Sequence, residues 1–191
     1  MTTHLAHPPP TRSAGVIEIL NTSRHEIALV LYGIVVLAHW LEHVAQAAQI
    51  YLFDWPVPEA GGALGLAFPW LVESELLHYG FALVMIVAFF VLRHGFGGRA
   101  RTWWGIALGI QFWHHIEHLL LLLQAWSGVH LLSRPVPTSI IQLVMPRVEL
   151  HLLYNAIVFV PMVVAMVLHR RGEDAGEPQV RCSCARVPSG G

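Results

Sequence analysis

Long apolar runs, interrupted by short polar segments, dominate the hydrophobic pattern of this chain. Four of the runs reach the length of about 18 residues or more that a helix needs to cross a bilayer. They lie near residues 26–53, 70–93, 102–126 and 147–169. Helices of a soluble bundle carry a charged outer face, and these runs show none. The pattern therefore predicts an all-α integral membrane protein built as a four-transmembrane-helix bundle.

The segments outside the runs complete the predicted domain organisation. Residues 1–24 are expected to form an N-terminal tail with room for a short surface helix. Residues 25–171 form the transmembrane domain, and residues 172–191, rich in Gly, Pro and Ser, form a disordered C-terminal tail. A hydrophobic share of 55%, a charged share of 12% and a mean hydropathy of +0.56 agree with this class, since soluble domains are far more polar.

Arginine is the only strongly basic residue type, and its distribution is uneven. Of the eleven arginines, nine lie in the two tails and around the turn between the second and third runs, whereas Arg134 and Arg147 precede the fourth run. Under the positive-inside rule this bias predicts a multi-pass protein of the cell membrane with both termini in the cytoplasm. Trp103 and Trp104 are expected at the cytoplasmic boundary of the membrane. No basic patch beyond these segments indicates nucleic-acid binding.

Two of the apolar runs contain the same polar motif. The segments 39–43 and 114–118 both read His-x-x-Glu-His. Residues at i, i+3 and i+4 share one face of a helix, so each motif predicts imidazole and carboxylate groups on one side of its helix. In the second run Glu75-x-x-His78 has the spacing of a carboxylate-bridged di-iron bundle, and His151 lies at a similar level in the fourth run.

These residues define a candidate set of metal ligands. At a rise of 1.5 Å per residue, the candidates of all four runs fall in the outer half of the bilayer, near the loops 54–69 and 127–146. Glu73 and Glu149 lie about 160° round their helices from the other candidates and predict a neighbouring crevice. The full set is His39, Glu42, His43, Glu73, Glu75, His78, His114, Glu117, His118, Glu149 and His151.

The chain also shows an internal repeat with an offset of about 75 residues. A shift of 75 places His39, Glu42, His43 and Gln49 on His114, Glu117, His118 and Gln124. A shift of 76 matches residues of the second run with residues of the fourth, Glu73 with Glu149 among them. The repeat predicts two tandem helical hairpins of one design.

A bound cation explains the polar residues better than ordinary packing does. An acidic side chain in mid-membrane costs on the order of 2.5–3.5 kcal/mol, and no Lys or Arg is expected within the runs to pair with Glu42, Glu75 or Glu117. Mixed imidazole and carboxylate ligands, too many for one tetrahedral zinc, predict two divalent ions, with Fe favoured and Cu or Zn as alternatives. The competing interpretation is a set of polar helix–helix contacts with neutral glutamates.

The motifs restrict the function to a few classes. A dinuclear centre in the outer half of the bilayer would suit a membrane oxidoreductase that activates oxygen against a lipid or quinone substrate. Its ligand style resembles that of membrane hydroxylases with clustered histidines and of ferritin-like bundles. The alternatives are a metal-ion or proton transporter or channel, a haem-binding membrane cytochrome, and an intramembrane zinc hydrolase, since His-x-x-Glu-His is also the inverted zinc-protease motif.

Other potential ligands lie outside the motifs. Cys182 and Cys184 form a Cys-x-Cys pair that is able to hold a soft metal, although two isolated cysteines in such a tail favour a tail without a special role. The histidines at run ends and in loops are expected to be interfacial residues; these are His25, His94, His130 and His169.

Overall fold

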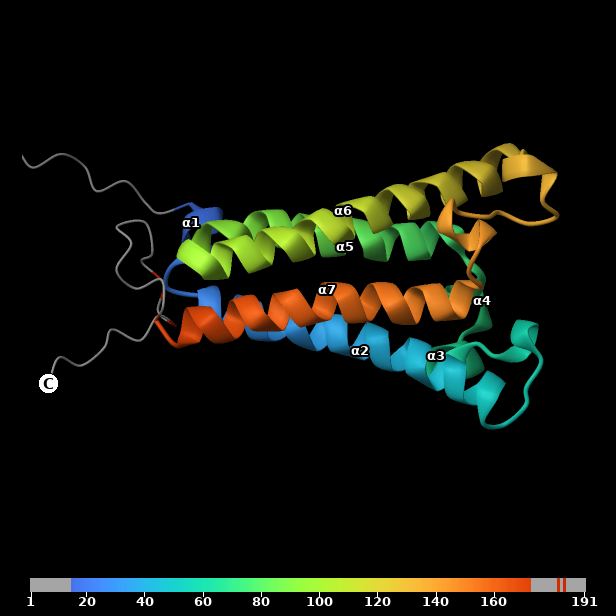
Figure 1. Cartoon of the computed structure of the whole chain (residues 1–191), viewed down its shortest axis with the longest axis horizontal. Coiled ribbons are helices and arrows are strands. Elements are labelled where there is room, and N and C mark those ends of the chain that lie inside the picture. The colour runs from blue at the N-terminus through green and yellow to red at the C-terminus, as the bar shows by residue number, and fades with distance from the viewer. Residues whose placement is uncertain (1–14, 173–181, 183, 185–191) are drawn as a thin grey trace, which may run out of the picture.

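Four long helices run side by side along the long axis of the molecule (Figure 1). The computed structural model describes residues 15–172 together with Cys182 and Cys184. The long helices are α2 (His25–Tyr51), α5 (Glu75–Leu92), α6 (Gly98–Ser127) and α7 (Arg147–Arg170). All described regular elements are helical. The predicted all-helical architecture with four long apolar helices is therefore confirmed.

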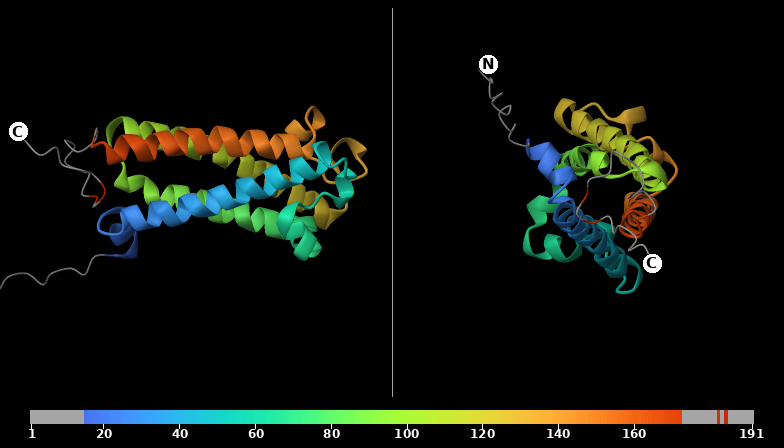
Figure 2. Two further views of the ribbon diagram at one scale, coloured as in Figure 1. Left: turned by 90° about the horizontal axis from the view of Figure 1, so that it is seen from below. Right: turned by 90° about the vertical axis from the view of Figure 1, so that its left-hand side faces the viewer.

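The shorter elements lie at the two ends of the bundle (Figures 1 and 2). At one end, here called the loop end (residues 52–74 and 128–146), lie α3 (Gly62–Ala67), α4 (Pro69–Glu73) and the 3-10 turns Val57–Glu59, Leu131–Ser133 and Ile141–Leu143. At the other, here called the terminal end, lie α1 (Val16–Asn21) and the turn η2 (Arg93–Gly95). The tails predicted at residues 1–14 and across most of 173–191 lie outside the described residues.

The order of the helices around the bundle brings distant segments together. Seen end-on, α5 packs against α6 and α6 against α7, while α2 contacts both α7 and α5 (Figure 2). The interface between α6 and α7 is the most extensive of these. Every face directed into the bundle therefore meets side chains from the other hairpin.

The outward faces of the four helices are apolar. All four helices are long and apolar enough to cross a membrane. Leu31 on α2, Val84 on α5 and Val160 on α7 are each more than half exposed. Such a surface is typical of helices that face lipid, with the polar residues turned inward.

The second predicted run is divided by Ser74. Residues 69–73 form α4, and α5 begins only at Glu75. Ser74 has an extended backbone (φ −80°, ψ 110°), and its hydroxyl accepts a hydrogen bond from the Leu77 amide at 3.3 Å, which is an N-cap. Glu73 therefore belongs to a different helix from Glu75, and the angular relation predicted between them does not apply.

An apolar core fills the half of the bundle nearest the terminal end. Phe89, Trp104 and Met162 are fully buried there. Trp104 packs on Phe96 at 4.4 Å between ring centroids, and its indole N–H donates to the Phe89 carbonyl at 3.0 Å. The predicted place of Trp104 at a membrane boundary is wrong, because α6 begins at Gly98, one turn earlier than expected, and this carries Trp104 inside.

Candidate metal centre

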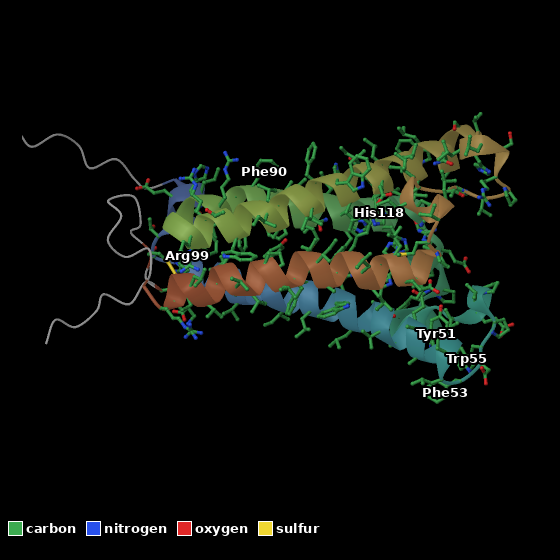
Figure 3. The ribbon with its side chains drawn as sticks, viewed as in Figure 1. Tyr51, Phe53, Trp55, Phe90, Arg99 and His118 are labelled. Atoms are coloured by element: carbon green, nitrogen blue, oxygen red, sulfur yellow. A yellow bond between two sulfur atoms is a disulfide. The ribbon has the colours of Figure 1, made fainter. Side chains whose placement is uncertain are left out.

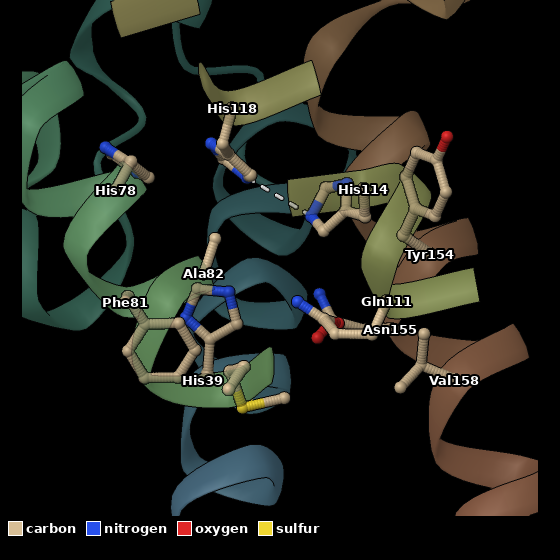
Figure 4. Close-up of a pocket in the computed structure, with 11 residues that line it drawn as sticks. His39, His78, Phe81, Ala82, Gln111, His114, His118, Tyr154, Asn155 and Val158 are labelled. Atoms are coloured by element: carbon tan, nitrogen blue, oxygen red, sulfur yellow. Dashed lines mark hydrogen bonds between the residues drawn. The ribbon is translucent and has the colours of Figure 1, made fainter. Parts of the chain in front are cut away.

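Histidines from all four long helices meet in the half of the bundle nearest the loop end. Figure 3 shows His118 within this region, and Figure 4 shows four of the rings around one small cavity. The cluster consists of His39 and His43 on α2, His78 on α5, His114 and His118 on α6, and His151 on α7. These six residues are called the histidine cluster below. Four of them, His43, His114, His118 and His151, are less than one-tenth exposed.

The cluster has the spacing of ligands around a small cation. One ring nitrogen from each of His114, His118 and His151 lies within 4.8 Å of the others. The Nε2 atoms of His114 and His118 are 3.2 Å apart, and adjacent nitrogen ligands of a tetrahedral zinc lie about 3.4 Å apart. The His43 ring lies 4.7 Å from that of His151, between centroids. Three histidines thus form a compact triad, with His43 beside it.

Hydrogen bonds orient three of the rings in the way that metal-binding histidines require. The Nδ1 atoms of His78 and His151 lie 3.0 and 2.7 Å from the carbonyl oxygens of Ser74 and Arg147. A carbonyl only accepts, so in each ring Nδ1 carries the proton and Nε2 keeps a lone pair. Metal-binding histidines are held by the same kind of outer hydrogen bond.

His43 follows the same arrangement through Gln46. Its Nδ1 lies 3.2 Å from the Gln46 side-chain oxygen, and the Gln46 amide nitrogen donates to the Ala60 carbonyl at 2.7 Å, which fixes the orientation of the amide. The Nε2 atoms of His43 and His151 are buried without a hydrogen-bond partner among the described residues. A buried acceptor left in this state costs free energy, so the arrangement indicates a ligand.

A cavity of about 20 Å³ lies between the rings (Figure 4). His39, His78, His114 and His118 line it together with Gln111 and Tyr154. This is room for about one water or one metal ion. Phe81 stacks on the His39 ring at 4.1 Å, and Tyr154 on the His114 ring at 4.1 Å, so packing restricts both imidazoles.

A much larger cleft of about 760 Å³ lies against the other side of the cluster, between α2 and α5. Its walls are mostly aliphatic, with Val35, Leu64, Leu71 and Val84 among them. The polar groups that line it include His39, His43 and His78. A volume of this order is typical of a small-molecule site.

The glutamates of the two repeated motifs bind the loop end instead of the cavity. Glu42 accepts a hydrogen bond from the backbone amide of Leu64. Glu117 accepts from the Ser139 hydroxyl and from the Ile141 amide, both at 3.0 Å. The second oxygen of Glu117 is buried without a hydrogen-bond partner among the described residues, but this carboxylate does not belong to the triad of ligand atoms.

The remaining predicted acidic ligands also have other surroundings. Glu75 forms a two-pronged ion pair with Arg147, at 2.6 and 2.9 Å. The expectation that no basic residue pairs with it is wrong, because Arg147 is the first residue of α7 and lies beside the start of α5. Glu149 accepts a hydrogen bond from the Tyr51 hydroxyl, and Glu73 is exposed. The structure thus brings the predicted histidines together and leaves the predicted glutamates around them.

Two glutamines hold the loops in matching ways. The Gln49 amide both donates to the Gly62 carbonyl (3.1 Å) and accepts from the Gly62 amide (2.7 Å). Gln124 does the same with Thr138, at 2.9 and 3.2 Å. Each loop is therefore fastened by a glutamine of its own hairpin, two turns beyond the Glu of the motif.

The ion pair between Glu75 and Arg147 gives a test of the role of Glu75. In Glu75→Gln the amide cannot balance the guanidinium, so we expect a loss of roughly 1–3 kcal/mol of stability, seen as a thermal midpoint lower by several degrees. The metal content of the purified protein is expected to stay unchanged. Arg147→Gln is the matched control and should destabilise similarly. Loss of metal in Glu75→Gln but not in Arg147→Gln would make Glu75 a ligand instead.

A second group of potential ligands lies at the terminal end. His25, His169, Cys182 and Cys184 are buried and offer ligand atoms within 4.8 Å of one another. The expectations of interfacial histidines and of a tail without a role are wrong for these residues. The available signal was the Cys-x-Cys pair in a chain with two potential ligands at span ends, but sequence distance conceals that these ends meet.

The described part of the chain is thus an all-helical bundle with four potential membrane spans and buried histidine groups that could hold metal ions. Comparisons with protein-family models, with curated proteins and with solved structures found no match to this chain.

Proposed function

We propose that this chain is an integral membrane metalloprotein whose histidine cluster holds divalent metal within the half of the bilayer nearest the loop end. One observation carries the proposal. Three buried imidazoles each have Nδ1 engaged by an oxygen acceptor, which leaves their Nε2 lone pairs for a cation. Ordinary helix–helix contacts would instead pair such nitrogens with donors.

The membrane location and its orientation belong to the same proposal. The long helices expose aliphatic side chains and keep the histidine cluster inside, as expected of a bundle in lipid. Arg93, Arg99 and Arg101 lie at the terminal end together with Arg170 and Arg171, whereas Arg134 and Arg147 lie at the loop end. We therefore place the terminal end in the cytoplasm.

A tandem duplication of one hairpin would account for the matched fastenings of the two loops. Gln49 with Gly62 and Gln124 with Thr138 are separated by 75 and 76 residues respectively, and both make the same pair of hydrogen bonds. Glu42 and Glu117 likewise both accept from a backbone amide of their own loop. The duplication supports two equivalent halves of one centre.

The ligand type bears on which metal is held. The prediction of two iron ions depends on carboxylate bridges, and Glu42, Glu75 and Glu117 each have other partners. A set made mainly of imidazoles suits copper and zinc as well as iron. We propose one ion on the triad of His114, His118 and His151. A second ion would be held by histidines of α2 and α5, once one glutamate leaves its present partner.

The cleft between α2 and α5 favours a membrane-borne substrate. Its aliphatic walls would accommodate a lipid chain or a quinone, and His39, His43 and His78 lie along its lining. A redox-active ion here would supply electron transfer or oxygen activation. The chain would contribute four oriented imidazole faces, an apolar wall that excludes water, and a site large enough for a chain-like molecule.

The other functional classes fit the geometry less well. The fully buried Phe89, Trp104 and Met162 fill the bundle between the histidine cluster and the terminal end, which weighs against a transport path. A cavity of about 20 Å³ between the rings is far too small for haem. Glu42 binds a loop amide, away from the position of a hydrolytic base.

Metal analysis of the purified protein tests the proposal. We expect protein extracted in detergent to retain at least one divalent ion per chain, with X-ray absorption showing the imidazole ligands of the cluster. Extraction of the protein by detergent but not by alkaline carbonate, with the metal retained, would support both parts of the proposal. A folded, membrane-derived preparation without stoichiometric metal would contradict it.

A further inference from the structure

The group of ligands at the terminal end lies far from the histidine cluster along the chain and along the bundle. His25 is the first residue of α2, and His169 lies in the last turn of α7. Cys182 and Cys184 come from the segment beyond α7 and lie against both rings. The apolar core around Trp104 separates this group from the histidine cluster. It therefore cannot be explained as part of the centre described above.

The distances within this group are those of shared coordination. The Cys182 sulfur lies 3.1 Å from His25 Nδ1, and the Cys184 sulfur lies 2.9 Å from His169 Nε2 and 3.6 Å from His25 Nδ1. Nitrogen and sulfur ligands of one tetrahedral zinc lie about 3.5 Å apart. Only small shifts separate these four atoms from the corners of such a site, once the two sulfurs are free to separate.

A hydrogen bond directs the His25 ring toward the sulfurs. Its Nε2 lies 3.2 Å from the Leu92 carbonyl oxygen, which only accepts. The proton of the neutral ring is therefore on Nε2, and the Nδ1 lone pair faces the cysteines. This is the outer hydrogen bond that holds metal-ligating histidines in one tautomer.

The surroundings of His25 fix its ring in place. A Cβ atom added at Gly95 would lie 2.3–2.6 Å from three atoms of the His25 ring. Gly95 is itself held by Asn21 of α1, whose side-chain oxygen accepts from the Gly95 amide at 2.7 Å. Phe96 packs against both His25 and His169 at 5.0 Å between ring centroids. The site is thus dry and built from four separate segments.

Charge balance favours a divalent ion in this position. All four ligands are buried, with His25 and His169 fully so. Two thiolates and one divalent cation sum to zero, so a buried complex of this composition avoids the large cost of an uncompensated charge. Zn²⁺ prefers tetrahedral sites of cysteine and histidine.

We propose that His25, His169, Cys182 and Cys184 form a Cys₂His₂ zinc site that fastens the C-terminal segment across the ends of α2 and α7. The structure joins the two cysteines by a disulfide, which is the two-electron oxidised, metal-free form of the pair. A phosphine reductant converts it to two thiols and becomes the phosphine oxide, with one water supplying the oxygen and the two protons. Zinc then displaces both thiol protons. In the orientation proposed above, the cytoplasm would maintain the reduced form.

Cobalt substitution tests this site separately from the histidine cluster. Reduced protein titrated with Co²⁺ under argon should gain a sulfur-to-cobalt charge-transfer band and the visible bands of tetrahedral cobalt, saturating at one equivalent of sulfur-bound ion. Cys182→Ser and Cys184→Ser should each abolish the charge-transfer band, and His25→Ala and His169→Ala should each weaken cobalt binding by about 100-fold or more. His94→Ala is the matched control, since His94 lies exposed on the neighbouring turn, and should leave the titration unchanged.

Zinc-loaded wild-type protein gives a reading that needs no variant. X-ray absorption should show sulfur neighbours at about 2.3 Å and nitrogen neighbours at about 2.0–2.1 Å, two of each after the contribution measured in the Cys182→Ser variant is subtracted. Absence of the charge-transfer band in reduced wild-type protein would overturn the proposal. So would a band of equal strength and affinity in His25→Ala and His169→Ala, or a zinc shell without sulfur. Loss of the histidine-cluster metal alone would leave all of these readings unaffected.

Discussion

His114→Ala is expected to remove the metal of the histidine cluster, whereas His115→Ala, one residue further along the same helix, is expected to leave it bound. His114 contributes an Nε2 atom 3.2 Å from that of His118 and is less than one-tenth exposed. His115 points to the other side of α6, where its ring lies 5.1 Å from that of Tyr79. Loss of an outer-shell partner alone typically costs 10–100-fold in affinity, so removal of a ligand should cost about 100-fold or more.

The comparison of these two variants is matched in residue type, helix and depth. Metal content is best measured in a chain that also carries Cys182→Ser and Cys184→Ser, so that zinc at the terminal end does not contribute. Thermal unfolding of each variant with and without added metal provides the second reading, because bound metal stabilises only the chain that retains the site. Equal metal content in the two variants, with both folded, would refute the assignment of His114.

The helical pattern was sufficient to predict the level and the convergence of the histidines. A residue on an apolar helix has only two choices, to face lipid or the bundle interior, and an imidazole strongly favours the interior. His43, His78, His118 and His151 could therefore be placed on one level from helix rise alone. The same reasoning predicted four long helices, since span length depends on composition and bilayer thickness.

The partners of the carboxylates could not be predicted in this way. Glu42 and Glu117 bind loop backbones whose path depends on the turns at Gly62 and Thr138, and Glu75 binds Arg147 because two helix ends happen to meet. Such contacts involve irregular segments and no periodic pattern. The energetic argument that glutamates in a membrane need a cation was correct in form, but a guanidinium provides it for Glu75.

The group at the terminal end was missed for a related reason. His25 and Cys182 are 157 residues apart, and no periodicity connects them. Their meeting depends on the bundle returning to the end at which it began, so that the start of α2 and the end of α7 are neighbours. An even number of spans makes this meeting a general consequence of the topology, and potential ligands at the two extremes of such a chain are worth examining together.

Gly80→Leu is expected to close the cleft between α2 and α5 and to prevent binding of a membrane-borne substrate. A Cβ atom at Gly80 would have no heavy atom within 4 Å, so the cleft can accept a side chain there without a clash. The added isobutyl group would occupy volume beside His78 and Phe81, and binding of a decyl-substituted benzoquinone in detergent should weaken about tenfold or more, equivalent to about 1.4 kcal/mol. The metal content should stay at the wild-type level, because no ligand is changed.

Gly105→Leu is the matched control for this effect. Gly105 also lies in a long helix with no heavy atom within 4 Å of an added Cβ, but it is exposed on α6, away from the cleft lining. Both variants replace a helical glycine and should gain similar helix propensity, about 1 kcal/mol at most. A difference in quinone binding between them can therefore come only from the cleft. If Gly80→Leu binds the quinone as well as Gly105→Leu does, the cleft is not the entry for substrate, and the histidine cluster would have to act without direct access from the membrane.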